Sequence, residues 1–327
     1  MATYTGSYVG PTSPYPTIVT FPGFHAEADV MALKNAVKGL GTDQETIITI
    51  LANRSSSQRQ EIIQQYKLIT GSDLIKDLKS DLSGNFEETA LALMEPPALY
   101  DAKLLYKAMK GAGTDEDALI EILSSRTNDE IKAINEIYME QFRRRLDEDI
   151  TGDTSGPLRK LLVSLSTGQR SEKPEVDQGK ARKEAEELYS AGEKKWGTDE
   201  SVFLKVLASR SHAQLRATFI AYEEIAQRSI LNSIEREMSG HTKKAYISVV
   251  KCVLNPAEYF ADELFTSMKG LGTDNKKLIR IIVSRAEIDM GNIKMAFLAK
   301  YNKALHIMVD GDTSGDYRDL LLAIIKP

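Results

Sequence analysis

The tripeptide Gly-Thr-Asp, which occurs four times, is the feature that most constrains the fold of this 327-residue chain. Its copies begin 72, 84 and 75 residues apart. After each first glycine, an arginine follows at 13 residues, an aromatic residue at 25, and a carboxylate in front of x-Ser-Gly at 40. The arginines are Arg54, Arg126, Arg210 and Arg285, the aromatic residues are Tyr66, Tyr138, Tyr222 and Phe297, and the carboxylates are Asp81, Asp153, Glu237 and Asp312. Four copies with the same offsets indicate four homologous units.

Each unit has the pattern of short helices. In the first one, the apolar residues from Ile47 to Leu51 recur at the spacing of a helix face, and a similar pattern follows around Tyr66. Thr42 with Glu45 resembles a capping box that begins a helix just after the glycines. Strand-like alternation of apolar and polar residues is absent over any useful length, so we expect an all-α fold.

Two segments lie outside the repeats. Residues 1–24 contain no charged residue but are rich in Thr, Ser, Tyr, Pro and Gly, which predicts a mobile or draped tail without regular structure. Residues 169–180 form a polar linker that explains the longest spacing, and we expect it to divide the chain into halves of two successive repeats. The expected boundaries are 1–24 for the tail, 25–96 and 97–168 for the first two repeats, 169–180 for the linker, and 181–255 and 256–327 for the last two repeats.

The composition narrows the possible environments. No apolar run approaches the ~18 residues that span a bilayer, and the first residues lack the basic and apolar pattern of a secretory signal. The single cysteine, Cys252, forms no internal disulfide and is expected to be a buried apolar residue, which fits a cytoplasmic location. A formal net charge of −5 argues against a general nucleic-acid binder.

The repeated spacing between glycine loop and carboxylate predicts a metal site in each repeat. In Lys38-Gly-Leu-Gly41, two glycines one residue apart allow a turn that exposes several backbone carbonyls on one side. Calcium takes six to eight oxygen ligands from carbonyls, carboxylates and water. Loop carbonyls and one bidentate carboxylate supply about five, which leaves positions for water or for a phosphate oxygen.

An EF-hand is a different calcium motif with a similar beginning. Asp310-Gly-Asp312-Thr-Ser314-Gly315 has the oxygens and the glycine of such a loop. The twelfth position, however, is Leu321, where the EF-hand needs a bidentate glutamate. The matching residues are Leu162 and Ala90 in the second and first repeats, so the EF-hand interpretation fails each time.

The sequence Met-Lys-Gly-x-Gly-Thr-Asp, followed about forty residues later by Asp or Glu before x-Ser-Gly, resembles the type II calcium site of the annexins. The resemblance covers roughly residues 24–327. It implies four repeats of about five helices each, packed as a slightly curved disc with the calcium loops on one face. It also implies calcium-dependent binding to anionic phospholipid membranes, where Ca²⁺ bridges the protein to lipid phosphate.

The resemblance also implies the ligands, residue by residue. Three carbonyls and one carboxylate are expected in each repeat: Val37, Gly39, Gly41 and Asp81; Met109, Gly111, Gly113 and Asp153; Gly192, Lys195, Gly197 and Glu237; and Met268, Gly270, Gly272 and Asp312. Lys38, Lys110, Lys195 and Lys269 in the loops are expected to attract anionic headgroups, and Trp196 suits a membrane interface. We expect a cytoplasmic protein that moves to membranes when calcium rises, with self-association on lipid and a protein partner for the tail as open questions.

Two other classes of function are weaker candidates. A helical-repeat scaffold without metal explains the repeats but not the fixed carboxylates. An enzyme is disfavoured because the chain has no GxxxxGK[ST] loop, no His-Glu-x-x-His and no Gly-x-Ser-x-Gly, and its four histidines show no metal-ligand spacing.

Overall fold

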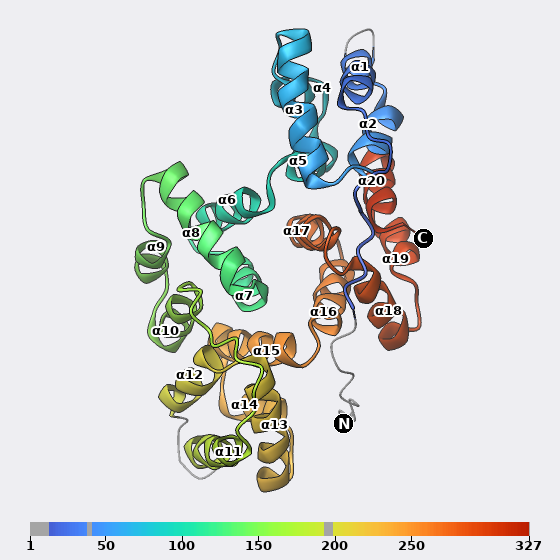
Figure 1. The fold of residues 1–327 in the computed structure, drawn as a ribbon. Coiled ribbons are helices and arrows are strands. Elements are labelled where there is room, and N and C mark those ends of the chain that lie inside the picture. The colour runs from blue at the N-terminus through green and yellow to red at the C-terminus, as the bar shows by residue number, and fades with distance from the viewer. Residues whose placement is uncertain (1–12, 38–40, 193–198, 327) are drawn as a thin grey trace. The chain divides into compact units, whose positions relative to one another are not determined.

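The computed structural model describes residues 13–37, 41–192 and 199–326. Within these ranges it contains twenty α-helices and no β-strand, five helices to each repeat (Figure 1). The prediction of an all-α protein with about five helices a repeat is therefore confirmed. None of the described helices is long and apolar enough to cross a membrane.

The five helices of a repeat have nearly the same lengths in each copy. The first repeat has α1 Ala26–Ala36, α2 Gln44–Leu51, α3 Ser56–Thr70, α4 Leu74–Asp81 and α5 Gly84–Met94; the second has α6 Pro97–Met109, α7 Glu116–Ser125, α8 Asn128–Phe142, α9 Leu146–Asp153 and α10 Gly156–Leu165. The third has α11 Gln178–Gly192, α12 Glu200–Ser209, α13 His212–Ala226, α14 Ile230–Glu237 and α15 Gly240–Leu254; the fourth has α16 Pro256–Met268, α17 Asn275–Arg285, α18 Met290–Tyr301, α19 Leu305–Asp312 and α20 Gly315–Ile325.

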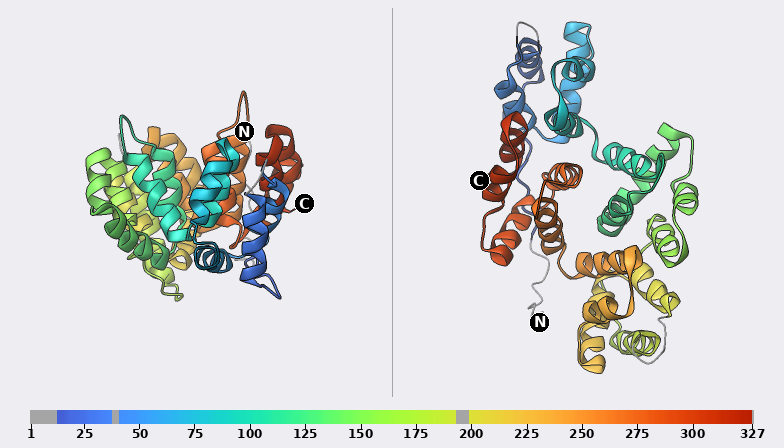
Figure 2. Two further views of the ribbon diagram at one scale, coloured as in Figure 1. Left: turned by 90° about the horizontal axis from the view of Figure 1, so that it is seen from above. Right: turned by 180° about the vertical axis from the view of Figure 1, so that it is seen from behind.

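The repeats are grouped into two compact units, and the grouping corrects our expectation. One unit contains residues 101–256, which are the second and third repeats, and the other combines residues 11–100 with 257–327. In the first unit α7 packs against α15 and α10 against α12; in the other, the equivalent helices α17 and α5 pack together, as do α20 and α2 (Figure 2). The prediction of halves made of successive repeats was wrong because apolar helix faces, rather than the polar linker, determine which repeats pack together.

The linker is itself part of the 101–256 unit. The backbone N–H of Ser171 donates to the carbonyl of Ser209, at 3.0 Å. The side chain of Gln214 in α13 exchanges two hydrogen bonds with the backbone of Asp177. These contacts satisfy the backbone of a polar segment that has no helix or strand partners of its own.

The core of each repeat is built on the repeated aromatic residue. Tyr66, Tyr138, Tyr222 and Phe297 are all 0% exposed. The hydroxyl of Tyr66 donates to Asp77 at 2.7 Å, and that of Tyr138 to Asp149 at 2.6 Å, so these buried phenols tie the third helix of a repeat to the fourth. A buried tyrosine whose hydroxyl is hydrogen-bonded adds a large apolar surface to the core and leaves no polar atom unpaired.

Residues 13–24 extend along the unit that contains the first and fourth repeats. The backbone of Tyr15 bonds to Asn292 and Gly291, and the N–H groups of Thr17 and Ile18 both donate to the carbonyl of Ala286. Gly291 has no space for a side chain, since an added Cβ would lie 2.4 Å from the ring of Tyr15. This part of the tail is therefore held in place, as the draped alternative of our prediction describes.

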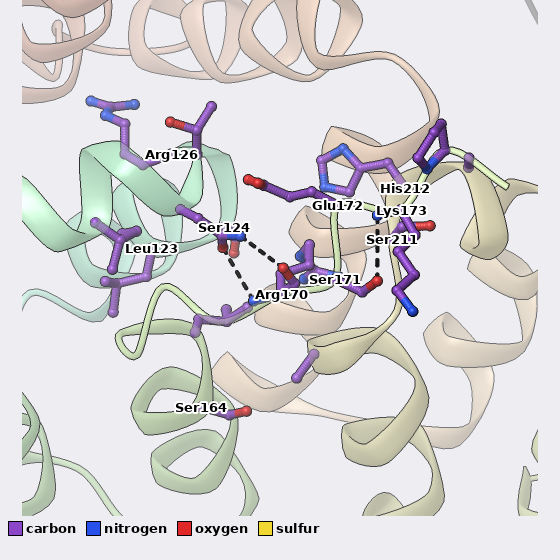
Figure 3. A pocket seen from close by; sticks show the side chains of 17 residues that line it. Leu123, Ser124, Arg126, Ser164, Arg170, Ser171, Glu172, Lys173, Ser211 and His212 are labelled. Atoms are coloured by element: carbon purple, nitrogen blue, oxygen red, sulfur yellow. Dashed lines mark hydrogen bonds between the residues drawn. The ribbon is translucent and has the colours of Figure 1, made fainter.

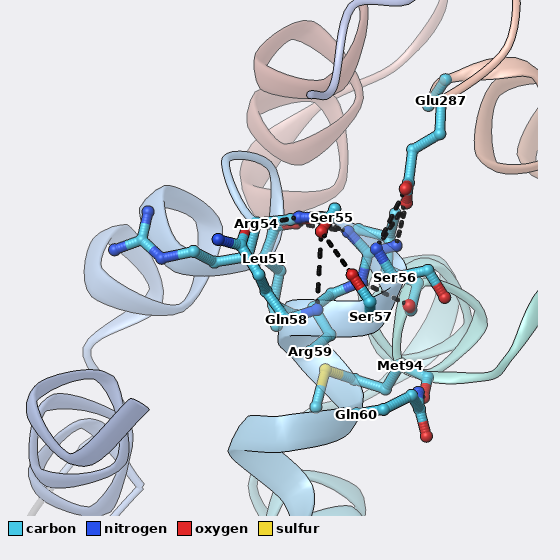
Figure 4. Close-up of polar contacts among 12 residues, drawn as sticks. Leu51, Arg54, Ser55, Ser56, Ser57, Gln58, Arg59, Gln60, Met94 and Glu287 are labelled. Carbon is cyan, nitrogen blue, oxygen red and sulfur yellow. Dashed lines mark hydrogen bonds and ion pairs between the residues drawn. The ribbon is translucent and has the colours of Figure 1, made fainter. Parts of the chain in front are cut away.

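The tail reaches the first repeat at Phe21. Its backbone exchanges two hydrogen bonds with Gln58, and its ring lies 3.9 Å from the guanidinium of Arg54. Glu287 joins the same two repeats directly, because its carboxylate accepts from the guanidinium of Arg59 and from the backbone N–H of Ser56 at the start of α3 (Figure 4). A carboxylate at a helix N-terminus is a favourable partner for the free N–H groups there.

We predict that the tail contributes to the stability of this unit through Ile18, which is 1% exposed, whereas its neighbour Val19 is 54% exposed. Ile18→Ala should lower the free energy of unfolding by about 2–4 kcal/mol, because it leaves a cavity in the core. Val19→Ala should change it by about 0.5 kcal/mol or less. Equilibrium urea unfolding measures both, and equal effects of the two substitutions would show that the tail is not packed as described.

Candidate metal centre

Each Gly-Thr-Asp loop is closed at its aspartate. The backbone N–H of the aspartate donates to a carbonyl in the last turn of the preceding helix: Asp43 to Ala36, Asp115 to Ala108, Asp199 to Ala191 and Asp274 to Ser267. The aspartate side chain then caps the next helix by accepting a backbone N–H. The third loop is one residue longer than the others, since eight positions separate Ala191 and Asp199 where seven separate the other pairs. This aspartate is therefore a structural cap.

The distant carboxylates occupy one structural position in all four repeats. Asp81, Asp153, Glu237 and Asp312 are the last residues of α4, α9, α14 and α19. Two residues later a serine precedes the next helix, which begins with a glycine at a φ between 58° and 62°. Glycine adopts this left-handed conformation readily, so the chain can turn sharply between the two helices, and the carboxylate lies at that turn.

In the second and fourth repeats the structure brings the loop and the carboxylate together. The hydroxyl of Thr114 donates to the carbonyl oxygen of Asp153 at 3.2 Å and lies 3.5 Å from its Oδ2. In the fourth repeat, the hydroxyl of Thr273 is 3.1 Å from the carbonyl oxygen of Asp312 and 2.5 Å from its Oδ2. The two parts of the predicted site, 39 residues apart in sequence, are thus in direct contact.

The glycines give these loops their shape. In the second repeat, Gly111 and Gly113 have φ angles of 115° and 96°, and in the fourth repeat Gly270 and Gly272 have angles of 114° and 91°. Residues with a side chain rarely adopt this region, so both positions of each loop require glycine. Outside the helices, no hydrogen bond between described backbone groups ends on the carbonyl oxygens of these four glycines.

The electrostatics of these loops favour a cation. Met109 is the last residue of α6 and Asp153 the last of α9, so the negative ends of two helix dipoles meet at the second loop. Met268 and Asp312 end α16 and α19 in the same way in the fourth repeat. Among the described residues, no group of three His, Cys, Asp or Glu side chains lies in a metal-binding arrangement. The predicted donor set, one carboxylate with several backbone carbonyls, suits calcium rather than zinc.

The first and third repeats are described only in part. Gly39, Lys195 and Gly197 lie outside the described residues, as do Lys38 and Trp196. In the first repeat, Val37 follows the last residue of α1, Gly41 has a φ of 104°, and Asp81 is exposed, but Thr42 makes no hydrogen bond to Asp81. In the third repeat, Gly192 and Glu237 end α11 and α14.

The loop lysines of the complete sites lie over aromatic rings. The Nζ atoms of Lys110 and Lys269 are 5.5 Å and 5.6 Å from the ring centres of Tyr106 and Phe265. Each ring in turn stacks on a third-helix aromatic, with Tyr106 against Phe142 and Phe265 against Tyr301, both at 3.9 Å. The side chains remain exposed, and the rings orient them beside the loop.

The repeated arginines fix the first helix of each repeat to the second. Arg126 forms a bidentate pair with Asp101, at 2.6 Å and 2.9 Å, and Arg54 pairs in the same way with Asp29. Arg210 pairs with Glu184 at 2.6 Å. Burial opposes the charge of Arg126, but the carboxylate of Asp101 raises the pKa of its guanidinium above the usual value.

The fourth repeat replaces this pair, and the sequence offsets alone did not reveal it. Phe260 stands where the other repeats have the acid, and the guanidinium of Arg285 lies 4.6 Å from the centre of its ring. Arg285 instead pairs with Asp289 four residues later, at 2.7 Å. The sequence signal for this difference was Phe260, at the position where the other repeats have the acidic partner of the arginine.

Taken together, the described residues define a four-repeat helical protein whose loops offer backbone oxygens and a carboxylate to a cation. The annexin family model matches four segments, residues 28–93, 100–165, 183–249 and 259–324. Annexin A4 of Bos taurus is 52% identical over 308 residues, which are 94% of this chain and 97% of the relative. The chain belongs to the annexin family, whose members are known as calcium-dependent phospholipid-binding proteins.

Solved structures agree with this assignment. A structure of annexin III superimposes with a TM-score of 0.94 at 44% identity, covering 96% of this chain and 98% of that one. A structure described as calcium-bound annexin (Sm)1 has a TM-score of 0.86 at 34% identity, covering 96% of this chain and 93% of that one.

The arginine pairs lead to a prediction on stability. Arg126→Ala leaves Asp101 buried without its partner and should lower the free energy of unfolding by about 3–5 kcal/mol. Arg145→Ala removes an exposed arginine that pairs with Asp147 and should leave the free energy of unfolding nearly unchanged, because solvent screens the pair. Urea unfolding compares the two, and a loss below 1 kcal/mol for Arg126→Ala would contradict the structural role assigned to the pair.

Proposed function

We propose that this protein binds anionic phospholipid membranes in a calcium-dependent manner, through one primary site in each repeat. The observation that supports this most strongly is the contact between Thr273 and Asp312, and between Thr114 and Asp153, which joins the glycine loop to the distant carboxylate. The ion supplies a positive charge that loop oxygens and lipid phosphate share. The calcium-bound annexin (Sm)1 supports the same cation for this chain.

The proposed ligands are those implied by the resemblance. Three backbone carbonyls and one carboxylate serve each ion: Val37, Gly39, Gly41 and Asp81; Met109, Gly111, Gly113 and Asp153; Gly192, Lys195, Gly197 and Glu237; Met268, Gly270, Gly272 and Asp312. The second and fourth repeats are proposed as the stronger sites, because their carboxylates are already held at the loop. The first is proposed as weaker, because Asp81 has no such bond to Thr42.

The membrane mechanism follows from incomplete coordination and from repetition. A site with about five protein ligands binds calcium weakly until lipid phosphate adds an oxygen, so calcium and lipid each raise the affinity for the other. Several weak contacts then act together as avidity. Lys110 and Lys269, held over their rings, add attraction to anionic headgroups.

In the cell, this proposal describes a cytoplasmic protein that is recruited to membranes when calcium rises and serves membrane organisation or trafficking. Self-association on lipid and a protein partner for the tail belong to the same proposal. Annexin relatives are not enzymes in general, and we propose no catalytic step. A metal-free helical scaffold is the alternative, and it predicts binding that is insensitive to the four carboxylates.

The carboxylates test the proposal directly. In co-sedimentation with phosphatidylserine vesicles, wild-type protein should bind with calcium and be released by chelator. Asp312→Asn should raise the calcium needed for half-maximal binding several-fold, because it removes the charged, bidentate ligand of one site. Asp310→Asn, an exposed aspartate two residues earlier on α19, is the matched control and should leave that concentration unchanged. Equal binding in chelator would contradict the mechanism and favour the scaffold.

The threonine contact gives a second, independent test. Thr273→Val removes the hydroxyl that holds Asp312 at the loop and should raise the calcium requirement about two- to tenfold, in line with the loss of one hydrogen bond to a charged group. Thr266→Val is the control, since this exposed threonine bonds only within α16, to the carbonyl of Glu263. An unchanged calcium requirement in Thr273→Val would remove the positioning role of the hydroxyl while leaving the role of Asp312 open to its own test.

A further inference from the structure

A pocket in the 101–256 unit lies at the opposite end of the helices from the calcium loops. Its volume is about 260 Å³, and it is lined by the ends of α7, α10 and α12, the starts of α8 and α13, and linker residues 170–174 (Figure 3). Leu123, Ile131, Leu165 and Ala208 supply apolar walls. The helices α7, α10 and α12 each begin beside a site loop and have ten residues, so the pocket lies about 15 Å from those loops.

Two helix N-termini converge on this pocket. Helix α8 begins after its cap Thr127, and helix α13 after its cap Ser211, and the first residues of both line the pocket. Each helix has fifteen residues. The backbone N–H groups of Asn128, His212 and Ala213 make no hydrogen bond to another described residue. Free N–H groups at two helix N-termini are donors that can bind the oxygens of an anion between them.

Arg170 is the second observation that points to an anion. Its Nη1 donates to the carbonyl of Arg210 at 2.9 Å, and this is the only hydrogen bond that its side chain makes within the described part of the chain. No described carboxylate lies in ion-pair distance of it, in contrast to the repeated arginines, which each have an acid. Burial lowers the pKa of its guanidinium to about 10, so the group is desolvated and still charged at neutral pH. A partly buried cation without a counter-ion costs folding free energy that a bound anion would recover.

The remaining polar groups of the pocket are mostly donors. The hydroxyl oxygen of Ser124 is buried and has no hydrogen-bond partner. Lys173 adds a positive charge at the exposed rim, where Glu172 supplies the opposing one. Ser124, Arg170, Ser171, Ser211 and His212 all line this pocket (Figure 3). These donors are a guanidinium, two helix N-termini and hydroxyls. An anion with several oxygens can accept hydrogen bonds from more of them than a carboxylate can.

We propose that this pocket binds a small soluble phosphate-bearing molecule, independently of calcium. A lipid headgroup of the membrane that the calcium loops engage is a poor candidate, because the pocket lies at the other end of α7 and α12. The ligand therefore binds while the loops are on the membrane as well as in solution. This proposal does not depend on the proposed calcium function, since it concerns different residues and a different face of the unit.

The test uses inorganic phosphate and the full chain. Isothermal titration calorimetry in chelator, with sodium chloride at matched ionic strength as the blank, should show saturable binding with a stoichiometry of one. Arg170→Gln should weaken phosphate binding about tenfold or more, as expected when a charge-assisted hydrogen bond is lost. Arg182→Gln, which removes the same charge from an exposed position on α11, should leave the affinity unchanged.

Lys173→Gln keeps the test decisive should Arg170→Gln fail to fold, since Lys173 is exposed and its replacement leaves the core intact. It should weaken phosphate binding by about two- to fivefold and reduce the dependence of the affinity on salt. Both variants should retain calcium-dependent vesicle binding. Absence of saturable binding in the wild type up to tens of millimolar, or equal affinities in Arg170→Gln and Arg182→Gln, would overturn the proposal. Vesicles of phosphatidylserine in chelator should not compete with phosphate, and competition would assign the pocket to a headgroup instead.

Discussion

One hydrogen bond, formed four times, carries the local architecture of this protein. The N–H of the aspartate in each Gly-Thr-Asp returns to a carbonyl in the last turn of the preceding helix, and the aspartate side chain caps the next one. The turn is thereby closed at its base. In the second and fourth repeats two residues of the turn are glycines with φ angles between 91° and 115°, a region that residues with a side chain rarely adopt. The shape of these loops is thus a consequence of how two short helices are joined.

Local chemistry explains why the sequence predicted so much of the site. Capping residues, glycines and the spacing of 40 residues act within one repeat, and each has a direct structural outcome at Asp115, Gly113 and Asp153. The pairing of repeats was predicted wrongly, since it depends on which apolar faces of α7 and α15 meet. The path of the tail depends likewise on groups that are distant in sequence, such as Asn292 and Gln58. No local sequence pattern predicts that these residues bind the tail. Sequence offsets therefore predict the structure within a repeat well, but they predict poorly which repeats pack against each other.

The fourth repeat shows that the shared plan tolerates the loss of a partner. With Phe260 in place of the acid, Arg285 would be a buried cation without a counter-ion. Asp289 supplies the charge from the turn before α18, and the aromatic face supplies part of the interaction that the acid makes elsewhere. The first and second helices still meet, because the guanidinium rather than the carboxylate is the fixed element. The arginine recurs in all four repeats, while its acid does not.

The same logic separates the paired arginines from Arg170. A guanidinium that holds helices together is expected to have its charge balanced within the protein, as Arg54, Arg126, Arg210 and Arg285 do. Arg170 lies in a linker that already bonds to α8 and α13 through backbone and amide groups, so the fold does not need its charge to hold that segment. The proposed cation sites and the proposed anion pocket therefore lie at opposite ends of α7 and α10 but are built from different groups. Loop carbonyls and a carboxylate are the proposed ligands of a cation at one end, and the free N–H groups of α8 and α13 with Arg170 are the proposed partners of an anion at the other.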